Sequence, residues 1–420
     1  MSNDAAFDLI ASAQAAKRAA AFMSTATIEQ KSAALRMMAK RLQANSKQIF
    51  DANAKDIDDA RRHGLSEAKV ERLTLNEKRM KEICLGLVQV ADLRDPIGEI
   101  IDGWVRPNGL SVSRVRVPIG LIGIIYESRP NVTVDAAALC IKSGNAVLLR
   151  GGSESLRSNK ALVSCLREAL TDSGLPADAV SFVESPDRSF VAEMAKLKGV
   201  IDCIIPRGGT ALINAVIETA TVPVIETGTG NCHIYVDDSA DFTAATDIII
   251  NAKVQRPSVC NAAETVLVHR AIAERFVPLA AAALHECKVE IRGDSSVQKL
   301  TSYAVEATEQ DWYEEYSDLI IAIKVVDNVT AAVDHINKYG THHSDSIITS
   351  SYENSQYFVG AVDSAAVYVN ASTRFTDGYE FGFGAEIGIS NQKLHARGPM
   401  GLTELTTYKY IVRGSGQIRE

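Results

Sequence analysis

The sequence lacks the features that mark several large classes of protein. No apolar run reaches the roughly 20 residues that a membrane-spanning helix needs. The first residues, Met1–Asp4, have neither the basic nor the apolar region of a signal peptide. The net charge is −8 without any basic block, which argues against a nucleic-acid-binding surface. We therefore expect a globular protein of the cytoplasm that binds neither a membrane nor a nucleic acid.

Cysteine is present without the spacing that a metal or disulfide framework uses. The seven cysteines are an odd number, and no Cys-X-X-Cys pair or Cys/His zinc spacing occurs. Free thiols of this kind are typical of a reducing compartment. His342-His343 is a weak metal motif without carboxylates at ligand spacing, so we expect a solvated turn there and no metal site.

The length and the element pattern predict more than one α/β domain. A chain of 420 residues is too long for one ordinary core, and two or three domains are expected. Residues 5–92 have helical periodicity, whereas residues 119–236 alternate strand, turn and helix. A second α/β pattern runs from about residue 241 to 376. Such alternation predicts an α/β fold with two parallel sheets, each covered by helices on both faces.

Residues 104–117 predict a β-hairpin. Apolar and polar residues alternate on both sides of Asn108-Gly109, and Asn-Gly favours a type I′ turn with two positive φ angles. Both strands carry arginine and lack a clearly buried face. A last strand is predicted within Thr403–Val412. We expect the hairpin to protrude and to pair with a second chain.

Two predicted strands end in glycine-containing turns. Residues 148–155 contain Arg150-Gly151-Gly152, and residues 204–211 contain Arg207-Gly208-Gly209. A helix N-terminus after such a turn attracts phosphate through free N–H groups and the helix dipole. Neither turn is a Gly-X-Gly-X-X-Gly motif, so the usual dinucleotide fingerprint is absent. The alternative is that glycine only relieves backbone strain in two ordinary α/β turns.

Three further segments carry chemically active side chains. Glu226 ends an apolar strand before a glycine loop, where it serves either acid–base chemistry or as a cap on nearby N–H groups. Arg374 follows another strand and is suited to a substrate carboxylate, with a surface salt bridge as the alternative. Residues 380–390 are rich in glycine and aromatic residues, and they too lie where α/β folds build sites.

Cys260 is the candidate nucleophile. Arg256 lies four residues before it, polar residues flank it, and a β-branched run follows. Positive charge near a thiol lowers its pKa, and the thiolate is the reactive form. Taken alone, a cysteine is more often a small buried apolar residue, and no histidine is placed as an obvious base. The other segments must therefore decide between the two interpretations.

Taken together and in order, these segments resemble the aldehyde dehydrogenase superfamily, and most closely its members that reduce an acyl phosphate. The resemblance covers nearly the whole chain. It is carried by residues 117–133, 142–152, 206–209, 226–236, 255–268 and 381–390. It implies two Rossmann-like domains with a small β oligomerisation element. The implied divisions are residues 1–103 and 118–230 for NADP binding, 231–385 for catalysis, and 104–117 with 400–413 for oligomerisation.

The resemblance also implies roles for individual residues. Cys260 matches the thiol nucleophile, Glu226 matches the glutamate ahead of the catalytic loop, and Asn131 is the nearest match to the oxyanion donor. The residues implied to bind the cofactor, NADPH or NADP, are Arg150, Ser153, Glu154, Arg207, Gly208, Gly209 and Glu315. The candidates for substrate binding are Arg129, Arg256, Arg374 and Glu386.

The sequence differs from the hydrolytic members at two places. They carry Pro-Trp-Asn where this chain has residues 127–131, and glutamine and glycine directly before the thiol, where this chain has Arg256 to Val259. An added arginine suits a substrate or leaving group that carries phosphate. Hydrolytic members also use the glutamate to activate water, whereas an enzyme for acyl phosphates must keep water from its thioester.

The implied activity is the NADPH-dependent reduction of L-glutamyl 5-phosphate to L-glutamate 5-semialdehyde and phosphate, through a cysteine thioester, in proline biosynthesis. A homo-oligomer and a glutamate kinase partner are implied with it. The alternative is a hydrolytic, NAD(P)-dependent aldehyde dehydrogenase for another small aldehyde. A non-catalytic cofactor-binding relative is a third interpretation, against which the retained Cys260 segment argues.

Overall fold

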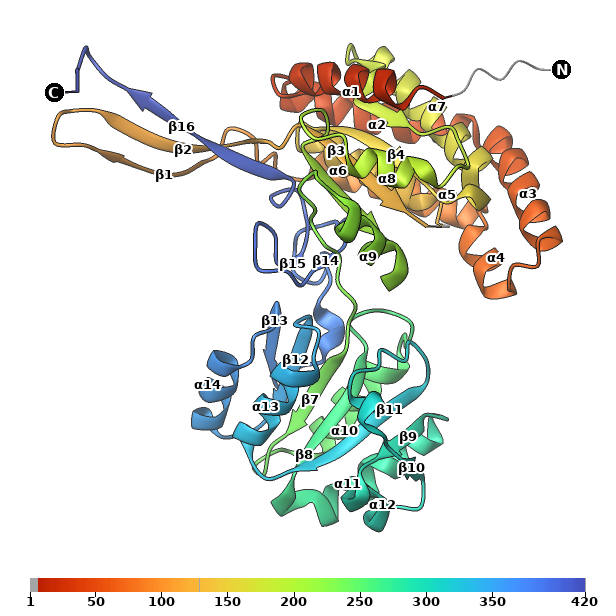
Figure 1. Cartoon of the computed structure of the whole chain (residues 1–420), viewed down its shortest axis with the longest axis vertical. Coiled ribbons are helices and arrows are strands. Elements are labelled where there is room, and N and C mark those ends of the chain that lie inside the picture. Colours follow the sequence, from red (N-terminus) through yellow and green to blue (C-terminus); the bar gives the residue numbers. More distant parts are fainter. Residues whose placement is uncertain (1–6, 128, 420) are drawn as a thin grey trace. The chain divides into compact units, whose positions relative to one another are not determined.

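The chain forms two compact units. The computed structural model describes residues 7–127 and 129–419 (Figure 1). Unit 1 comprises residues 1–226, 383–388 and 400–420, and unit 2 comprises residues 227–382 and 389–399. Within the described residues, no helix combines the length and apolarity that a bilayer span requires.

Unit 1 begins with the helices that the periodicity predicts for residues 5–92. They are α1 (Leu9–Met23), α2 (Ile28–Ala44), α3 (Ser46–Arg62), α4 (Glu67–Leu73) and α5 (Glu77–Asp92). Thr27 and Gln30 form a capping box at the start of α2, in which each side chain bonds the other residue's backbone N–H. The helices bury apolar faces, and the prediction of a helical amino-terminal region is confirmed from Leu9 to Asp92, whereas residues 5 and 6 lie outside the described residues.

A four-stranded parallel sheet follows in unit 1, with the order β5-β4-β3-β6. Its strands are β3 (Leu121–Tyr126), β4 (Ala146–Arg150), β5 (Val180–Phe182) and β6 (Cys203–Arg207). Its helices are α6 (Asn131–Lys142), η1 (Ser153–Ser155), α7 (Leu156–Asp172), η2 (Ala177–Ala179), α8 (Ser189–Ala195) and α9 (Thr210–Thr219). Every residue of β3, β4 and β5 is buried, as expected for a sheet covered on both faces.

The apolar strand that was predicted to end at Glu226, over residues 222–225, does not form. Only a single parallel bridge joins Ile204 to Val224. Pro223 accepts a hydrogen bond from the Ile204 N–H at 2.8 Å, but proline has no N–H with which to extend the ladder. The prediction was wrong because it gave the apolar run more weight than the proline inside it.

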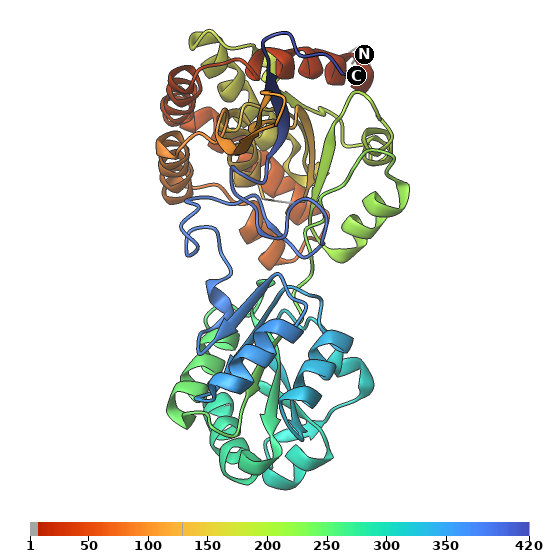
Figure 2. The same ribbon diagram turned by 90° about the vertical axis from the view of Figure 1, so that its left-hand side faces the viewer.

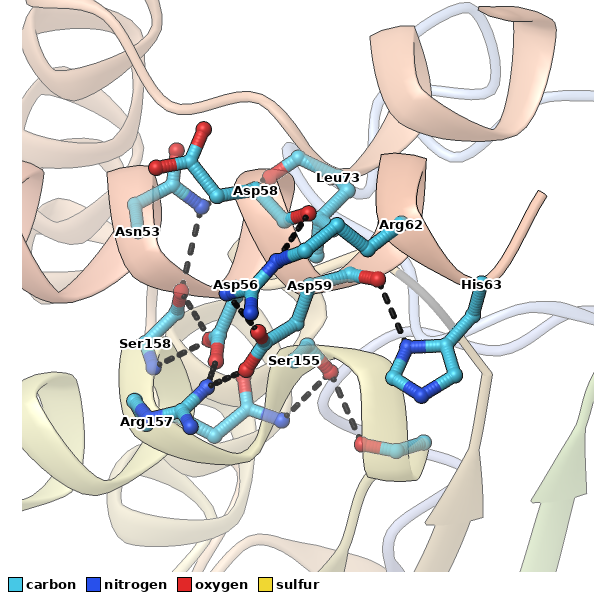
Figure 3. Close-up of polar contacts among 12 residues, drawn as sticks. Asn53, Asp56, Asp58, Asp59, Arg62, His63, Leu73, Ser155, Arg157 and Ser158 are labelled. Carbon is cyan, nitrogen blue, oxygen red and sulfur yellow. Dashed lines mark hydrogen bonds and ion pairs between the residues drawn. The ribbon is translucent and has the colours of Figure 1, made fainter. Parts of the chain in front are cut away.

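Figure 3 shows how α3 fixes the start of α7. The buried Asp56 carboxylate accepts bonds from the Ser158 backbone N–H at 2.8 Å and from the Ser158 hydroxyl at 2.7 Å. Arg157 pairs with Asp56 at 3.2 Å and with Asp59 at 2.7 Å. Ser158 lies in the first turn of α7, where N–H groups lack partners within the helix. Asp56 therefore caps α7 from another helix and anchors η1, which directly precedes α7.

The predicted hairpin is present, and the carboxyl-terminal strand joins it. In the sheet β1-β2-β16, β1 (Ile100–Val105) and β16 (Thr406–Arg413) both pair antiparallel with β2 (Ser111–Pro118). All of β1 is exposed, and Trp104, Tyr408 and Tyr410 present large apolar surface. Figure 1 shows this three-stranded ribbon extending from the rest of its unit.

The turn of this hairpin differs from the predicted type I′. Gly109 has a positive φ of 85°, and Asn108 does not. The Gly109 N–H donates to the Arg106 carbonyl at 2.9 Å, so the turn spans residues 106–109 with Pro107 at its second position. Proline fixes φ near −65°, which suits that position of a type I turn. Pro107 thus favours a type I turn over a type I′ turn, and only Gly109 adopts the left-handed conformation.

Unit 2 contains a seven-stranded sheet in which all neighbouring strands are parallel, with the order β10-β9-β11-β8-β7-β12-β13. The strands are β7 (Cys232–Val236), β8 (Ala263–His269), β9 (Glu290–Gly293), β10 (Ala304–Glu306), β11 (Ile320–Val326), β12 (Ser344–Ile348) and β13 (Ala366–Val369). The helices are α10 (Phe242–Val254), α11 (Arg270–Glu286), α12 (Ser295–Leu300), η3 (Glu309–Trp312), α13 (Val329–Tyr339), α14 (Tyr352–Ala361) and η4 (Thr373–Phe375). A small hairpin pairs β14 (Ile389–Ser390) with β15 (Gly398–Pro399).

Helices cover both faces of this sheet (Figure 2). Along β7, Ile234 and Val236 pack into one apolar cluster with α10 and α11. Tyr235, between them, packs into the opposite cluster with α13 and α14. This alternation follows from the two-residue period of a strand. The prediction of α/β units with parallel sheets is confirmed for both units.

Candidate active site

Cys260 lies in the turn between α10 and β8. It is half-buried, and the Ala262 N–H closes the turn on the Val259 carbonyl at 3.0 Å. Its neighbour Asn261 anchors the turn, since its side chain donates to the Thr376 carbonyl at 2.9 Å. The Asn261 carbonyl accepts a bond from the Thr373 hydroxyl at 2.7 Å. The thiol therefore sits on a loop that η4 and its flanking residues hold in place.

Most of the other cysteines have the properties of inert thiols. Burial raises the pKa of Cys84, Cys140 and Cys232, that of Cys165 to about 11 and that of Cys203 to about 12. A thiol with so high a pKa remains protonated near neutral pH and is a poor nucleophile. For Cys140, Cys165, Cys203 and Cys232 the interpretation of a cysteine as a small buried apolar residue therefore holds.

A glycine loop packs directly on the backbone of the thiol. A methyl group on Gly230 would lie 1.4 Å from the Cys260 carbonyl oxygen, so no side chain fits there. The Gly230 N–H donates to the Glu315 carboxylate at 3.0 Å. The side chain of Asn231 donates to the carbonyls of Trp312 at 2.7 Å and Tyr339 at 3.0 Å. The loop is thus fixed on both sides, and it brings Glu315 to the segment that contacts Cys260.

Two guanidinium groups belong to the same site. Arg374 donates to the Gln255 side chain at 3.0 Å and to that of Asn261. Burial lowers the pKa of Arg374, repulsion from Arg256 lowers it further, and the Cys260 thiolate raises it. Arg256 itself is exposed. The structure therefore brings Cys260, Arg256 and Arg374 together, with positive charge that stabilises a thiolate or an anionic substrate.

The first glycine turn of unit 1 is built around Arg150 and Gly151. Arg150 is 6% exposed, donates to the carbonyls of Gly151 at 2.7 Å and Asp187 at 3.2 Å, and leaves its buried Nε without a partner. A methyl group on Gly151 would lie 2.3 Å from the Asn159 amide, which the buried Thr133 and Ser155 hold in place. Gly151 is therefore required by close packing.

Ser153 and Glu154 follow in η1. The Ser153 hydroxyl contacts the Glu154 carboxylate at 3.5 Å, and that carboxylate folds back over Gly152. Ser153 is exposed and Glu154 partly so. Both are thus accessible just before α7, whose first turn Asp56 caps.

The second glycine turn leads into α9. The Gly209 N–H donates to the Glu127 carboxylate at 3.3 Å, so an anion already occupies this helix N-terminus. Arg207 donates to the carbonyl of Ile387. The donors at this turn suit a phosphate group, which competes with a carboxylate for the same N–H groups. The residues present therefore fit a dinucleotide cofactor.

The remaining predicted residues lie on unit 1. Asn131 begins α6 and donates to the Asp135 carboxylate at 2.9 Å. Arg129 is exposed just before α6, Glu226 is the last residue of the long unit 1 segment, and Glu386 lies in the short segment 383–388. Their assigned roles stay predictions.

The sequence did not reveal a buried ion pair beside the thiol loop. Lys253 of α10 and Glu264 of β8 are each 0% exposed, with Nζ and Oε2 2.5 Å apart. The sequence did contain an indication of this pair: a carboxylate lies inside an apolar strand segment, and a lysine lies on an apolar helix eleven residues before it. Glu127 was also missed as a partner of Gly209.

The paired histidines correct another expectation. A solvated turn was expected at both residues. His343 is instead fully buried and bonds the Ser344 hydroxyl at 2.8 Å, and of the two only His342 is partly exposed to solvent. The His335 ring of α13 is buried against His233, Trp312 and Tyr339. Within the described part of the chain, no three His, Cys, Asp or Glu side chains gather in a way that could hold a metal ion.

These imidazoles predict acid lability. Burial lowers the pKa of His335 to about 2 and that of His343 to about 4, below the ordinary 6.5. Below about pH 6.5 these imidazoles bind protons in the unfolded chain but not in the folded chain. The free energy of unfolding therefore falls as pH falls. We expect each imidazole to lower the free energy of unfolding by about 2 kcal/mol between about pH 7 and pH 5. In denaturant titrations at both pH values, the decrease in the free energy of unfolding should be about half as large for His335→Asn as for the wild type. An equal decrease in both proteins would refute this prediction.

Comparisons with known proteins agree over nearly the full length. The model of the aldehyde dehydrogenase family matches residues 2–311. A γ-glutamyl phosphate reductase of Caldanaerobacter subterraneus subsp. tengcongensis is 59% identical over 97% of this chain and 99% of its own. A γ-glutamyl phosphate reductase of Clostridium botulinum is 57% identical over 98% of this chain and 100% of its own. The crystal structure of the γ-glutamyl phosphate reductase of Thermotoga maritima superposes with a TM-score of 0.97 at 53% identity, covering 99% of this chain and 100% of that one.

Proposed function

The chain belongs to the aldehyde dehydrogenase family and, within it, groups with the γ-glutamyl phosphate reductases, and from this premise we propose its reaction and the residues that carry it. Members of the family use NAD or NADP. The proposed reaction is the NADPH-dependent reduction of L-glutamyl 5-phosphate to L-glutamate 5-semialdehyde and phosphate. The observation that carries it is the pair of guanidinium groups of Arg256 and Arg374 beside the half-buried Cys260. The hydrolytic alternative is not favoured.

In the proposed mechanism the Cys260 thiolate attacks the acyl carbon, and phosphate leaves as the thioester forms. The cofactor, when bound, would supply a hydride to the acyl carbon, and cleavage of the C–S bond would then release the aldehyde and return Cys260 as the thiolate. The Cys260 backbone N–H and the Asn131 amide are the proposed oxyanion donors, and losing one such donor typically costs about 10²–10³ in rate. Arg256 balances the negative charge of the leaving phosphate. We assign no base role to Glu226, because activated water would hydrolyse the thioester.

We propose that the cofactor is held by residues of both glycine turns and by one carboxylate. Ser153, Glu154 and Arg150 would contact the adenosine ribose end of the cofactor, where the Ser153 hydroxyl can donate to a 2′-phosphate and the Glu154 carboxylate can accept from a ribose hydroxyl. Gly208 and Gly209, with Arg207, would hold phosphate at the start of α9, where Glu127 now accepts the N–H bond. Glu315 would accept a bond from the nicotinamide ribose. Support comes from the N–H donors at α9 and from the unpartnered Nε of Arg150.

The partners and the compartment are further parts of the proposal. The three-stranded ribbon β1-β2-β16 exposes aromatic side chains without a second layer, so we propose that it pairs with another copy in a homo-oligomer. A glutamate kinase would supply the acyl phosphate. Arg129 and Glu386 are proposed to contact the amino-acid end of the substrate. Seven free cysteines support a reducing cytoplasm.

The experiment that tests this function measures reduction of NADP or NAD by glutamate 5-semialdehyde in phosphate buffer. Turnover with a preference for NADP is expected. If the purified protein oxidises other small aldehydes as well as it does the semialdehyde, or shows no turnover with either cofactor, the proposal fails.

Arg256→Ala is expected to raise the KM for phosphate in this direction about tenfold and to leave the KM for NADP unchanged, because a charge-assisted bond to phosphate is lost. Arg270→Ala is the matched control, since Arg270 is an exposed arginine of the same unit that pairs with Asp327. Equal phosphate KM values for Arg256→Ala and the wild type would remove this role.

A further inference from the structure

The buried ion pair of Lys253 and Glu264 has no part in the mechanism above. Lys253 lies near the end of α10 and Glu264 near the start of β8, so the pair joins the two elements on either side of Cys260. Burying two charges costs several kcal/mol unless hydrogen bonds satisfy both groups. The presence of such a costly ion pair next to the thiol loop therefore needs a functional or structural explanation.

The second oxygen of Glu264 points to that reason. It accepts a bond from the Ser317 N–H at 3.3 Å. Ser317 has a φ of 53°, a left-handed conformation that is uncommon for residues with a side chain. Glu315 lies two residues before it and accepts the bond from Gly230, which packs on the Cys260 carbonyl. A continuous series of contacts thus runs from the ion pair through Ser317 and Glu315 to the backbone of the thiol.

Charge balance links the same groups. Burial raises the pKa of Glu264 to about 8, and the attraction of Lys253 opposes this rise. Burial also raises the pKa of Glu315, which the Gly230 N–H and Lys253 both lower. Two carboxylates therefore share one poorly solvated region, and the Lys253 ammonium is the cation that favours the ionised form of each.

We propose that Glu264 is a positioning residue, which holds the 315–317 segment so that the Glu315 carboxylate is presented to the cofactor. This inference rests on the proposed function, in which Glu315 contacts the nicotinamide ribose. Glu264 acts through the Ser317 N–H. Lys253 balances the buried charge of Glu264 and is dispensable once residue 264 is neutral.

The test compares two double variants, Lys253→Met with Glu264→Gln and Lys253→Met with Glu264→Leu. Both remove the ion pair without leaving a lone buried charge, a change that proteins often tolerate. Only glutamine keeps a carbonyl oxygen to accept the Ser317 N–H. We expect the leucine variant to raise the KM for NADPH about tenfold and the glutamine variant to stay within about twofold of the wild type. The KM for phosphate should be unchanged in both, and melting temperatures report folding.

Equal KM values for NADPH in the two double variants would overturn the inference. A second measurement needs no substitution: amide hydrogen exchange in the wild-type protein should show slow exchange at Gly230 and Ser317, and rapid exchange at both would also overturn it. Glu315→Ala separates the two proposals. If it leaves the KM for NADPH unchanged while the wild type turns over, only the positioning inference fails; if the wild type shows no turnover, the proposed function fails.

Discussion

Cys260→Ala is expected to abolish turnover, with a loss in kcat of at least about 10⁴-fold. The reason is chemical: without the thiolate no thioester forms, and the other groups of the site act only on that intermediate. The same variant should bind NADPH with the affinity of the wild type, since the proposed cofactor residues are untouched. Steady-state rates and fluorescence titration of NADPH measure the two quantities separately.

Cys287→Ala is the matched control for this experiment. Cys287 is another partly exposed thiol of unit 2, at the end of α11, and it lies outside the contacts that anchor the Cys260 loop. It should keep wild-type rates. If Cys260→Ala retains a kcat within about tenfold of the wild type, Cys260 is not the nucleophile.

Gly230→Ala is expected to lower kcat/KM by at least about 100-fold, the scale of loss when a reacting group is misplaced by about 1 Å. The added methyl group would lie 1.4 Å from the Cys260 carbonyl oxygen and 2.7 Å from its Cα, both backbone atoms, so the thiol loop or the glycine loop must move. The same movement would pull the Gly230 N–H from Glu315. Rates, together with the rate of thiol alkylation, measure the displacement.

Gly360→Ala provides the comparison for a glycine without such a neighbour. Gly360 lies in α14, and a methyl group there would meet nothing within 4 Å. It should leave the rates unchanged and stabilise the protein by up to about 1 kcal/mol, because alanine favours a helix. A Gly230→Ala variant as active as Gly360→Ala would show that the thiol loop tolerates displacement.

Much of the fold was predictable because buried parallel strands and amphipathic helices leave strong patterns. The α/β alternation predicted over residues 119–236 and 241–376 contains the apolar, β-branched runs of β3, β4, β7, β8 and β11. β9 and β10 were not predicted, since each is short and carries charged, partly exposed residues in place of a buried apolar run. Two errors of local structure involve proline: Pro107 changed the hairpin turn, and Pro223 stopped a strand.

The candidate site was predicted only in part. The match of ordered motifs identified Cys260, Arg256 and Arg374, which the structure brings together, and the family and its reductase members are confirmed by the comparisons. The packing of Gly230 on Cys260 and the path from Lys253 to Glu315 depend on contacts between segments far apart in the sequence. No local pattern encodes such contacts, because they arise from how β7, β8 and the 315–317 loop lie beside one another.

The central claim is that phosphate, and not water, exchanges with the thioester on Cys260. It is tested most directly by oxidising glutamate 5-semialdehyde with NADP in two matched buffers, one with inorganic phosphate and one without. We expect a rate at least about 100-fold lower without phosphate, since hydrolysis of the thioester is suppressed. A rate that does not depend on phosphate would show that water resolves the thioester and would identify a hydrolytic enzyme.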